Sequence, residues 1–421
     1  FVLRLILNIN IMELVNKSIY KISNVTEKPV ISPSYITEKP ISIYKDSFIK
    51  ILDKYKNMID NIRNIKIWDY CKKLGNNYEL IHQCVKQKQT NHGISNYNPI
   101  SRAFFKFWEI IVDFDLLNDS EPIHYGALAE GPGGFIEAFN IYRRKYYNKT
   151  NDRIDCITLK AEERDRDVPG WKNSKNIFNE CDNYNISWGE DGTGNLYNVN
   201  NIIDFSKQFK NDKAHIVTGD GGFDVSGDYC NQEILASRLI LSEVVTGLAI
   251  LKKHGNMVIK YFDTFYDISF DIIYLLSYYF EEVYITKPHT SRPANSEKYI
   301  VCKNYKVIEK TELQKLYNII SDFEISKKQN KYINRILSNT LDNDFQECIY
   351  NCNLYFIKKQ IQALLKSLTY SKITLDNKSI NNIKNKQIIY SLSWCIKYKF
   401  PINYRCRYLK ERNSYNYIPT F

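Results

Sequence analysis

The glycine-rich run Ala129-Glu130-Gly131-Pro132-Gly133-Gly134-Phe135 constrains the fold of this chain more than any other segment. It follows an apolar, strand-like stretch, residues 125–129, and precedes an amphipathic stretch that begins at Ile136. A glycine turn between a strand and a helix lets the backbone approach a ligand at the positive end of the helix. Glycines at such turns also serve packing alone, so this run by itself leaves both interpretations open.

Beyond this turn, strand-like and helix-like segments alternate along the chain. The predicted strands are residues 124–129, 155–159, 215–219, 256–261, 282–286 and 299–303, and the predicted helices are residues 135–147, 232–253 and 269–280. Strands separated by helices indicate a doubly wound, mostly parallel sheet. Ligands of such sheets bind beyond the carboxyl ends of the strands, where the glycine-rich turn also lies.

These patterns divide the chain of 421 residues into three regions. Residues 1–99 are predicted to form an N-terminal extension, flexible where prolines recur in residues 20–45 and helical in residues 46–90. Residues 100–305 carry the α/β pattern. Residues 306–421 form a basic, mainly helical C-terminal region.

Cysteines and histidines give no indication of a metal site. The ten cysteines contain no CxxC pair, and the six histidines form no cluster. Scattered thiols are typical of an intracellular protein. No apolar segment is long enough to span a membrane. We therefore expect a soluble, cytoplasmic protein without a metal. A sequence that begins with Phe1 is either a fragment or an over-extended gene model whose true start is Met12.

The basic charge of the chain is concentrated near its C-terminus. From Lys303 onward there are 21 Lys and Arg residues against 9 Asp and Glu residues, whereas the net charge of the whole chain is +11. Cations interleaved with tyrosine and tryptophan, as in residues 394–410, suit a single-stranded nucleic acid whose bases stack on aromatic rings. Ordinary amphipathic helices that dock on the core are the alternative interpretation of the same residues.

Three charged side chains stand where predicted strands end or begin. Asp220 follows the strand at 215–219, Lys260 lies near the end of the strand at 256–261, and Glu297 ends a polar loop before the last strand. Because the carboxyl ends of parallel strands share one edge of the sheet, we expect all three near the glycine turn.

Lys260 has the character of a candidate base. Burial and a second cation both lower the pKa of a lysine, and Lys106, on an aromatic-rich predicted helix at residues 101–117, is a candidate for that cation. A structural ion pair of Lys260 with Asp220 or Glu297 is the alternative interpretation, since such networks also perturb pKa values.

Four segments together resemble one known family. They are Glu130-Gly-Pro-Gly-Gly-Phe135, Asp220-Gly-Gly222, Ile259-Lys260 and Ser291-Arg-Pro-Ala-Asn-Ser-Glu297. In this order they resemble the FtsJ/RrmJ-type ribose 2′-O-methyltransferases over about residues 100–305. Ser101-Arg-Ala-Phe-Phe-Lys106 and the Ser291–Glu297 segment are most similar to the mRNA cap-1 branch, which includes enzymes of metazoa and of large cytoplasmic DNA viruses.

The resemblance implies a Rossmann-like methyltransferase fold with a seven-stranded, mostly parallel sheet and helical N- and C-terminal extensions. It also implies S-adenosylmethionine as the methyl donor and a catalytic tetrad of Lys106, Asp220, Lys260 and Glu297. In this scheme Lys260 accepts the ribose 2′-hydroxyl proton, Lys106 opposes the charging of Lys260, Asp220 steers the lysine, and Glu297 hydrogen-bonds Lys260. No metal is required.

The resemblance also implies the residues of the donor site. The glycine turn holds the methionine end of the donor, and a loop at residues 189–196 reads its adenosine, through Asn195 or alternatively Asp191. The residues matched to this site are Glu130, Gly131, Pro132, Gly133, Gly134, Phe135, Asp191, Asn195 and Asp220.

The expected substrate is RNA, at the first transcribed nucleotide of a capped mRNA, in the cytoplasm or a virus factory. Other capping or transcription proteins are the expected partners. A methyltransferase of ribosomal or transfer RNA, or a non-catalytic RNA-binding homologue of the same fold, are the alternatives.

Overall fold

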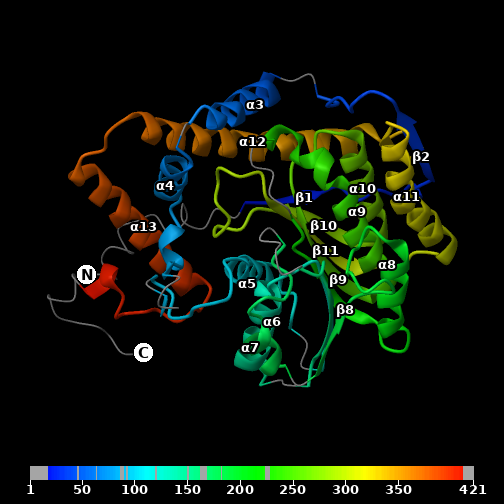
Figure 1. The fold of residues 1–421 in the computed structure, drawn as a ribbon, viewed down its shortest axis with the longest axis horizontal. Helices are drawn as coiled ribbons and strands as arrows, with labels where there is room; N and C mark the ends of the chain where they lie inside the picture. Colours follow the sequence, from blue (N-terminus) through cyan, green and yellow to red (C-terminus); the bar gives the residue numbers. More distant parts are fainter. Residues whose placement is uncertain are drawn as a thin grey trace.

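One eight-stranded sheet forms the centre of the protein, which we describe from a computed structural model (Figure 1). In sequence, the residues described are 18–44, 47–62, 64–85, 90–91, 93–118, 121–148, 151–161, 168–181, 183–222 and 228–410. The expected start at Met12 and the end of the C-terminal region, residues 411–421, lie outside this set.

The strand order of the sheet is β1-β10-β11-β9-β8-β5-β6-β7. From one edge to the other, the strands are β1 (Ile19–Ile22), β10 (Phe280–Thr286), β11 (Lys298–Tyr305), β9 (Leu251–Tyr261), β8 (Ala214–Gly219), β5 (His124–Leu128), β6 (Arg153–Ile157) and β7 (Asn183–Ser187). Strands β9, β8, β5, β6 and β7 pair in parallel, whereas β11 is antiparallel to both of its neighbours. The predicted mostly parallel sheet is confirmed.

The predicted number of seven strands is wrong by one. The additional strand is β1, which pairs antiparallel with β10 and extends the sheet at its edge. It lies in the segment predicted to be flexible, residues 20–45, which also contains β2 (Ile31–Ile36). Both strands are short: β1 has only four residues, and Pro33 and two serines in β2 conceal the alternation that indicates a strand.

Helices cover both faces of the sheet (Figure 1). One buried cluster packs four of them against one face: α8 (Val199–Ser206), α9 (Gln232–Ile250), α10 (Asp267–Tyr279) and α11 (Lys310–Lys328). A second cluster packs three others against the opposite face: α5 (Ala103–Phe114), α6 (Gly134–Tyr147) and α7 (Lys175–Asn179). Helix α13 (Asn377–Lys397) joins this cluster through contacts with α5, such as that of Trp394 with Phe105. The result is a three-layer α/β architecture. Among the described residues, no helix has the length and apolar character needed to cross a membrane.

Segments from the two ends of the chain pack together around this core. The N-terminal helices α3 (Ser47–Asp60) and α4 (Ile65–Gly75) form a third buried cluster with the long C-terminal helix α12 (Asn343–Lys372). Strand β2 pairs antiparallel with β12 (Tyr332–Leu337), a strand within the region predicted to be mainly helical. The remaining short elements are β3 (Cys84–Val85), β4 (Thr90–Asn91), α14 (Arg407–Lys410) and the 3₁₀ helices η1 (Glu79–Ile81), η2 (Lys207–Phe209) and η3 (Tyr229–Asn231).

Aromatic side chains on α5 anchor this helix in the core. Trp108 is fully buried, its ring centroid lies 5.0 Å from that of Phe400, and its Nε1 donates a hydrogen bond to the carbonyl oxygen of Tyr398 at 3.2 Å. Helix α5 is therefore held between the sheet and the C-terminal segment, which fixes the position of the lysine at residue 106.

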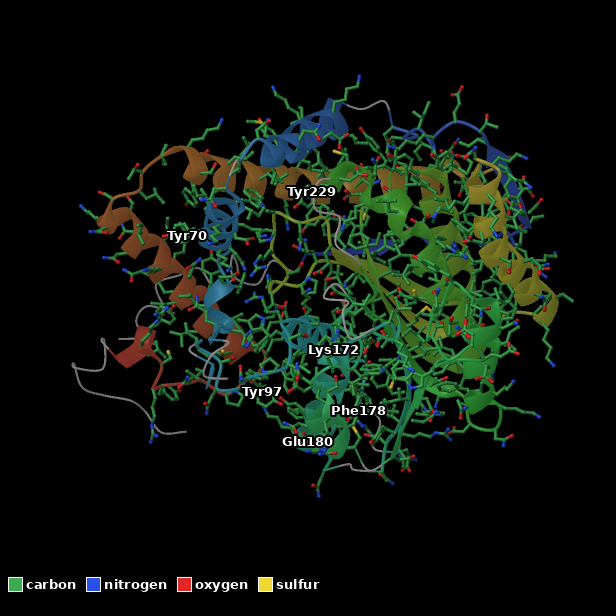
Figure 2. The ribbon with its side chains drawn as sticks, in the orientation of Figure 1. Tyr70, Tyr97, Lys172, Phe178, Glu180 and Tyr229 are labelled. Atoms are coloured by element: carbon green, nitrogen blue, oxygen red, sulfur yellow. The ribbon has the colours of Figure 1, made fainter. Side chains whose placement is uncertain are left out.

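We expect Trp108→Ala to lower the free energy of unfolding by about 3–5 kcal/mol, because the truncation leaves a cavity among buried rings. Urea denaturation followed by circular dichroism measures this change. Tyr70→Ala on α4 is the control, since Tyr70 (Figure 2) is 51% exposed, and it should change the value by no more than about 0.5 kcal/mol. Equal effects of both substitutions would contradict the anchoring role of Trp108.

Candidate active site

The glycine-rich turn connects β5 to α6 through a backbone that few residues other than glycine adopt. Gly133 has φ of 104° and precedes the first residue of α6. A Cβ atom added at Gly131 would collide with the carbonyl oxygen of Gly170. The turn therefore passes directly against the segment at residues 168–170, and the two together form one wall of a cavity.

Glu130 holds this turn from inside the protein rather than facing a ligand. Its carboxylate accepts hydrogen bonds from the hydroxyl groups of Tyr125, at 3.0 Å, and of Thr218, and it is 3% exposed. Burial raises the pKa of Glu130 well above its usual value. Phe135 is likewise buried, stacked on Phe107 with ring centroids 4.5 Å apart.

The cavity beside the turn has a volume of about 640 Å³ and lies at the carboxyl ends of β5, β8 and β9. This is the place where ligands of doubly wound sheets bind. We call it the glycine-turn cavity. Of the residues predicted for the donor site and the tetrad, those that line it are Gly131, Pro132, Asn195, Asp220, Lys260 and Glu297.

Asn195 and Asp191 play different parts in the loop that follows β7. Asn195 lines the glycine-turn cavity, whereas Asp191 accepts hydrogen bonds from Thr193 at 2.9 Å and from the side chains of Asn198 and Asn201. These bonds hold the pKa of the Asp191 carboxyl well below its usual range. The geometry thus favours Asn195 as the ligand contact and Asp191 as a residue that shapes the loop.

The four residues of the predicted tetrad form two ion pairs. Gly219 is paired with Ile259 in the sheet, so the residues that follow them, Asp220 and Lys260, lie side by side. Lys260 Nζ lies 3.0 Å from Asp220 Oδ1 and donates a hydrogen bond to the Asp220 carbonyl oxygen at 2.8 Å.

The second ion pair joins α5 to the segment before β11. Lys106 Nζ lies 2.7 Å from Glu297 Oε1 and 2.8 Å from Glu297 Oε2. The side chains of this pair are 13–15% exposed. The expectation that Glu297 hydrogen-bonds Lys260 is therefore wrong here: Glu297 binds Lys106, and Lys260 binds Asp220.

Charges around Lys260 favour its ammonium form. Burial opposes the charge, but Asp220, Glu297 and Glu243 outweigh this effect, so the pKa of Lys260 lies above its usual value. The expectation that its neighbours depress this pKa is therefore wrong. Burial also acts on Glu297, but Lys106 and Lys260 prevail and lower the pKa of Glu297 to about 2.

Two further groups support the lysine and were not found in the sequence. Tyr299, opposite Lys260 in the sheet, donates its hydroxyl proton to Asp220 Oδ1 at 2.9 Å. Glu243 on α9 accepts a hydrogen bond from the Gly221 amide at 3.0 Å, and burial raises its pKa to about 8. Glu243 is the single acid in residues 239–250, the mostly apolar second part of α9, and this pattern is the signal that could have identified it.

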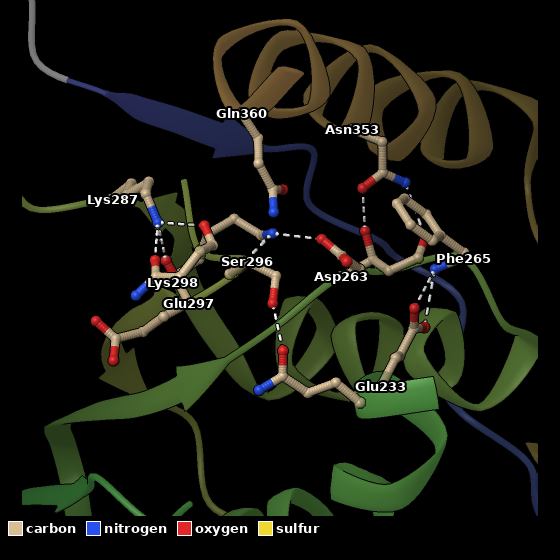
Figure 3. A network of polar contacts seen from close by, with 12 residues as sticks. Glu233, Asp263, Phe265, Lys287, Ser296, Glu297, Lys298, Asn353 and Gln360 are labelled. Carbon is tan, nitrogen blue, oxygen red and sulfur yellow. Dashed lines mark hydrogen bonds and ion pairs between the residues drawn. The ribbon is translucent and has the colours of Figure 1, made fainter. Parts of the chain in front are cut away.

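The loop that carries Glu297 is held from several sides (Figure 3). Ser291 Oγ donates to Glu297 Oε1 at 2.8 Å, and Lys287 Nζ donates to the Glu297 carbonyl oxygen at 2.6 Å. Gln360 Nε2, on α12, donates to the Ala294 carbonyl oxygen at 3.2 Å. Lys287 stands just after β10, so the strand-end argument applied to Lys260 could also have identified it.

Comparison with known families agrees with this geometry. Residues 99–305 match a family model described as FtsJ-like methyltransferase. These residues form an FtsJ-like methyltransferase domain. Its span includes the glycine turn, both ion pairs and the loop before β11, so the resemblance noted in the sequence is confirmed.

Curated relatives of this domain include proteins named cap-specific mRNA (nucleoside-2′-O-)-methyltransferase 1. The relative from Dictyostelium discoideum is 29% identical over 340 residues, which cover 74% of this chain and 41% of the relative. The relative from Mus musculus is 31% identical over 257 residues, which cover 59% of this chain and 30% of the relative. The chain thus spans less than half the length of these two relatives.

We expect Asp220→Asn to lower the pKa of Lys260, because burial of the lysine in the FtsJ-like domain persists while the nearest carboxylate loses its charge. Nuclear magnetic resonance titration of ¹³Cε-labelled lysines measures the shift. Glu281→Gln, an exposed carboxylate on β10, serves as the control and should leave the titration unchanged. An unchanged pKa in Asp220→Asn would contradict the assigned ion pair.

Proposed function

We propose that this protein is an S-adenosylmethionine-dependent RNA 2′-O-ribose methyltransferase that acts on the first transcribed nucleotide of capped mRNA. The observation that carries this proposal is the convergence of Lys106–Glu297 and Lys260–Asp220 on the rim of the glycine-turn cavity. The names of the curated relatives support the capped RNA as substrate. A cytoplasmic location and capping or transcription proteins as partners belong to the same proposal and rest on the sequence resemblance.

The residues of the glycine-turn cavity fit the proposed methyl donor. Its volume of about 640 Å³ lies within the range of about 300–1,000 Å³ that is typical of ligand pockets. Ser101 Oγ lines it and has no hydrogen-bond partner within the described residues, so a ligand can supply one. Gly131 and Pro132 would hold the methionine end and Asn195 the adenosine. The donor supplies an electrophilic methyl group when bound.

The ion pairs assign a role to each member of the tetrad. As an ammonium, Lys260 donates hydrogen bonds that orient a ribose hydroxyl; as a neutral amine, it accepts the hydroxyl proton. A further positive charge in the cavity lowers the pKa of Lys260 and increases the share of the amine. Lys106 is neutralised by Glu297, so it orients the ribose without adding a net charge.

The basic C-terminal region is the proposed RNA-binding surface. Exposed lysines on α13 include Lys378, Lys384 and Lys386. Helix α13 lies on the opposite side of the molecule from α11 (Figure 1). Exposed cations attract the phosphates of a nucleic acid and release counterions when they bind it. Deleting residues 306–421 is not a clean test of this surface, because α12 also holds the loop that carries Glu297 through Gln360.

We expect Lys260→Met to reduce methyl transfer to capped RNA at least about 100-fold, because the group that orients and deprotonates the hydroxyl is lost. Transfer from labelled S-adenosylmethionine, with mass-spectrometric mapping of the product, measures the effect. Lys253→Met, an exposed lysine of the same strand, serves as the matched control and should leave the rate unchanged.

Uncapped transcripts provide the comparison for this assay. Equal methylation of capped and uncapped RNA would contradict the cap assignment and favour a ribosomal or transfer RNA target. Full activity of Lys260→Met would contradict the catalytic assignment. RNA binding without methyl transfer in the unaltered protein would favour a non-catalytic homologue.

We expect replacement of Lys378, Lys384 and Lys386 by Gln to weaken RNA binding. If each lysine contacts one phosphate, the slope of log affinity against log salt concentration becomes less steep by about 3. Fluorescence anisotropy at several salt concentrations measures the slope. The same number of substitutions on α11, at Lys310, Lys327 and Lys328, should change it less; equal changes would contradict a binding surface on α13.

A further inference from the structure

A second cavity lies behind the loop that carries Glu297. Its volume is about 170 Å³, and it is enclosed by the end of α4, the loop after β10 and helix α12. It shares Asn295 and Ser296 with the glycine-turn cavity, so a single stretch of chain separates the two. We call it the α12 cavity. Polar and basic residues that line it include Asn76, Asn77, Lys287, Asn295, Lys298 and Lys359.

Two of its three lysines have only uncharged hydrogen-bond partners. Lys287 Nζ donates to the carbonyl oxygens of Asn295 and Glu297, at 2.9 and 2.6 Å (Figure 3). Lys359 Nζ donates to Ser18 Oγ at 3.0 Å and to the Tyr355 hydroxyl at 2.5 Å. In the part of the chain described, neither lysine forms an ion pair.

The nearby carboxylates are already engaged by other cations. Glu297 binds Lys106, and Asp263 lies 3.0 Å from Lys298 Nζ and 2.8 Å from Lys56 Nζ. A partly buried cation without a counterion is unfavourable, and a bound anion reduces this cost. The wall of the α12 cavity therefore presents positive charge that no carboxylate among the described residues neutralises.

The geometry points to an anion-binding site in the α12 cavity, in which Lys287 and Lys359 hold a phosphate group. The side-chain amides of Asn76, Asn77 and Asn295, which also line the cavity, can donate to the remaining oxygens of such a group. The phosphate belongs either to the RNA strand that enters the neighbouring cavity or to a free phosphate ion. The first source rests on the proposed function; the anion site itself does not.

The charge of Lys287 makes anion binding at this site depend on pH. Burial lowers the pKa of Lys287 to about 7; Lys298 and Lys106 add to the decrease, whereas Glu297 and Asp263 oppose it. Lys359 is the charged residue that lines the cavity from α12, and the lining residues of α4 carry no charge. Because Lys287 is charged below pH 7 and neutral above it, anion affinity should fall as pH rises through 7.

Crystals of the full chain soaked in selenate test the location of the site. We expect an anomalous selenium peak within hydrogen-bond distance of Lys287 Nζ and Lys359 Nζ. Sulfate, which keeps its charge of −2 across this range, tests the affinity by calorimetry at constant ionic strength. Its dissociation constant should rise by about tenfold for each pH unit above 7.

Two variants separate anion binding from the support of the loop. Lys287→Met should weaken sulfate binding at least about 10-fold, because a charge-assisted hydrogen bond is lost. Lys359→Gln should weaken it as well, and it leaves the bonds from Lys287 to the Glu297 loop in place. Lys253→Met is the control, and the thermal unfolding midpoint of each variant reports its folding.

Competition identifies the source of the phosphate. If the RNA strand supplies it, sulfate weakens RNA binding more than chloride does at equal ionic strength, and Lys359→Gln removes this difference. If a free ion supplies it, RNA affinity is the same in both salts while the selenate peak remains. Absence of the peak, or sulfate affinity that is equal in Lys359→Gln and the unaltered protein, would overturn the proposal. Loss of methyl transfer alone would not, because sulfate binding is measured without RNA or donor.

Discussion

Four charged side chains, partly buried at one edge of the sheet, set the arrangement of this protein. A charge removed from water is strongly unfavourable unless an opposite charge and hydrogen bonds replace the solvent. Lys260 meets Asp220 within the sheet, and Lys106 meets Glu297 across the gap between helix α5 and the last strand. Helix α5 can therefore pack against the sheet in only one register, and the loop before β11 must reach it.

The helices outside the FtsJ-like domain extend this constraint. Asp263, two residues beyond the end of β9, is bound by Lys56 of α3 and by Lys298 of β11. Ala294 of the Glu297 loop belongs to the same buried cluster as residues of α3, α4 and α12. The N-terminal and C-terminal extensions thus both contact the segments next to the proposed tetrad. They form part of the structure that positions the tetrad and are not separate domains.

Much of this arrangement could be predicted from the sequence, because strand-end positions and glycine turns have direct geometric meanings. The placement of Asp220 and Lys260 follows from that rule alone. The pairing of Lys106 with Glu297 does not follow from it. Hydrophobic periodicity locates the helix that carries Lys106, but it does not identify the residue from another part of the chain that contacts this lysine. Strand β7, with the sequence Asn-Tyr-Asn-Ile-Ser, escaped prediction because it is polar and lies at the exposed edge of the sheet.

The pKa values of the site were predicted less well than its positions. Burial and a neighbouring cation both lower the pKa of a lysine. The direction of the net shift depends on which carboxylates lie nearest, and for Lys260 on strand β9 these include Glu243 of helix α9. Sequence spacing gives no distance between side chains on separate elements. For Lys260 those distances decide the direction of the shift.

The pairing of β1 with β10 and of β2 with β12 has a consequence for biosynthesis. The ribosome releases β1 and β2 long before their partners, which begin at Phe280 and Tyr332. Until then β1 and β2 lack the partner strands β10 and β12, whose backbone groups form hydrogen bonds with theirs. Helices α3 and α4 likewise lack helix α12, which covers their apolar faces. These N-terminal elements must therefore remain without their partners until β10, β12 and α12 have emerged from the ribosome, and they complete their folding only then.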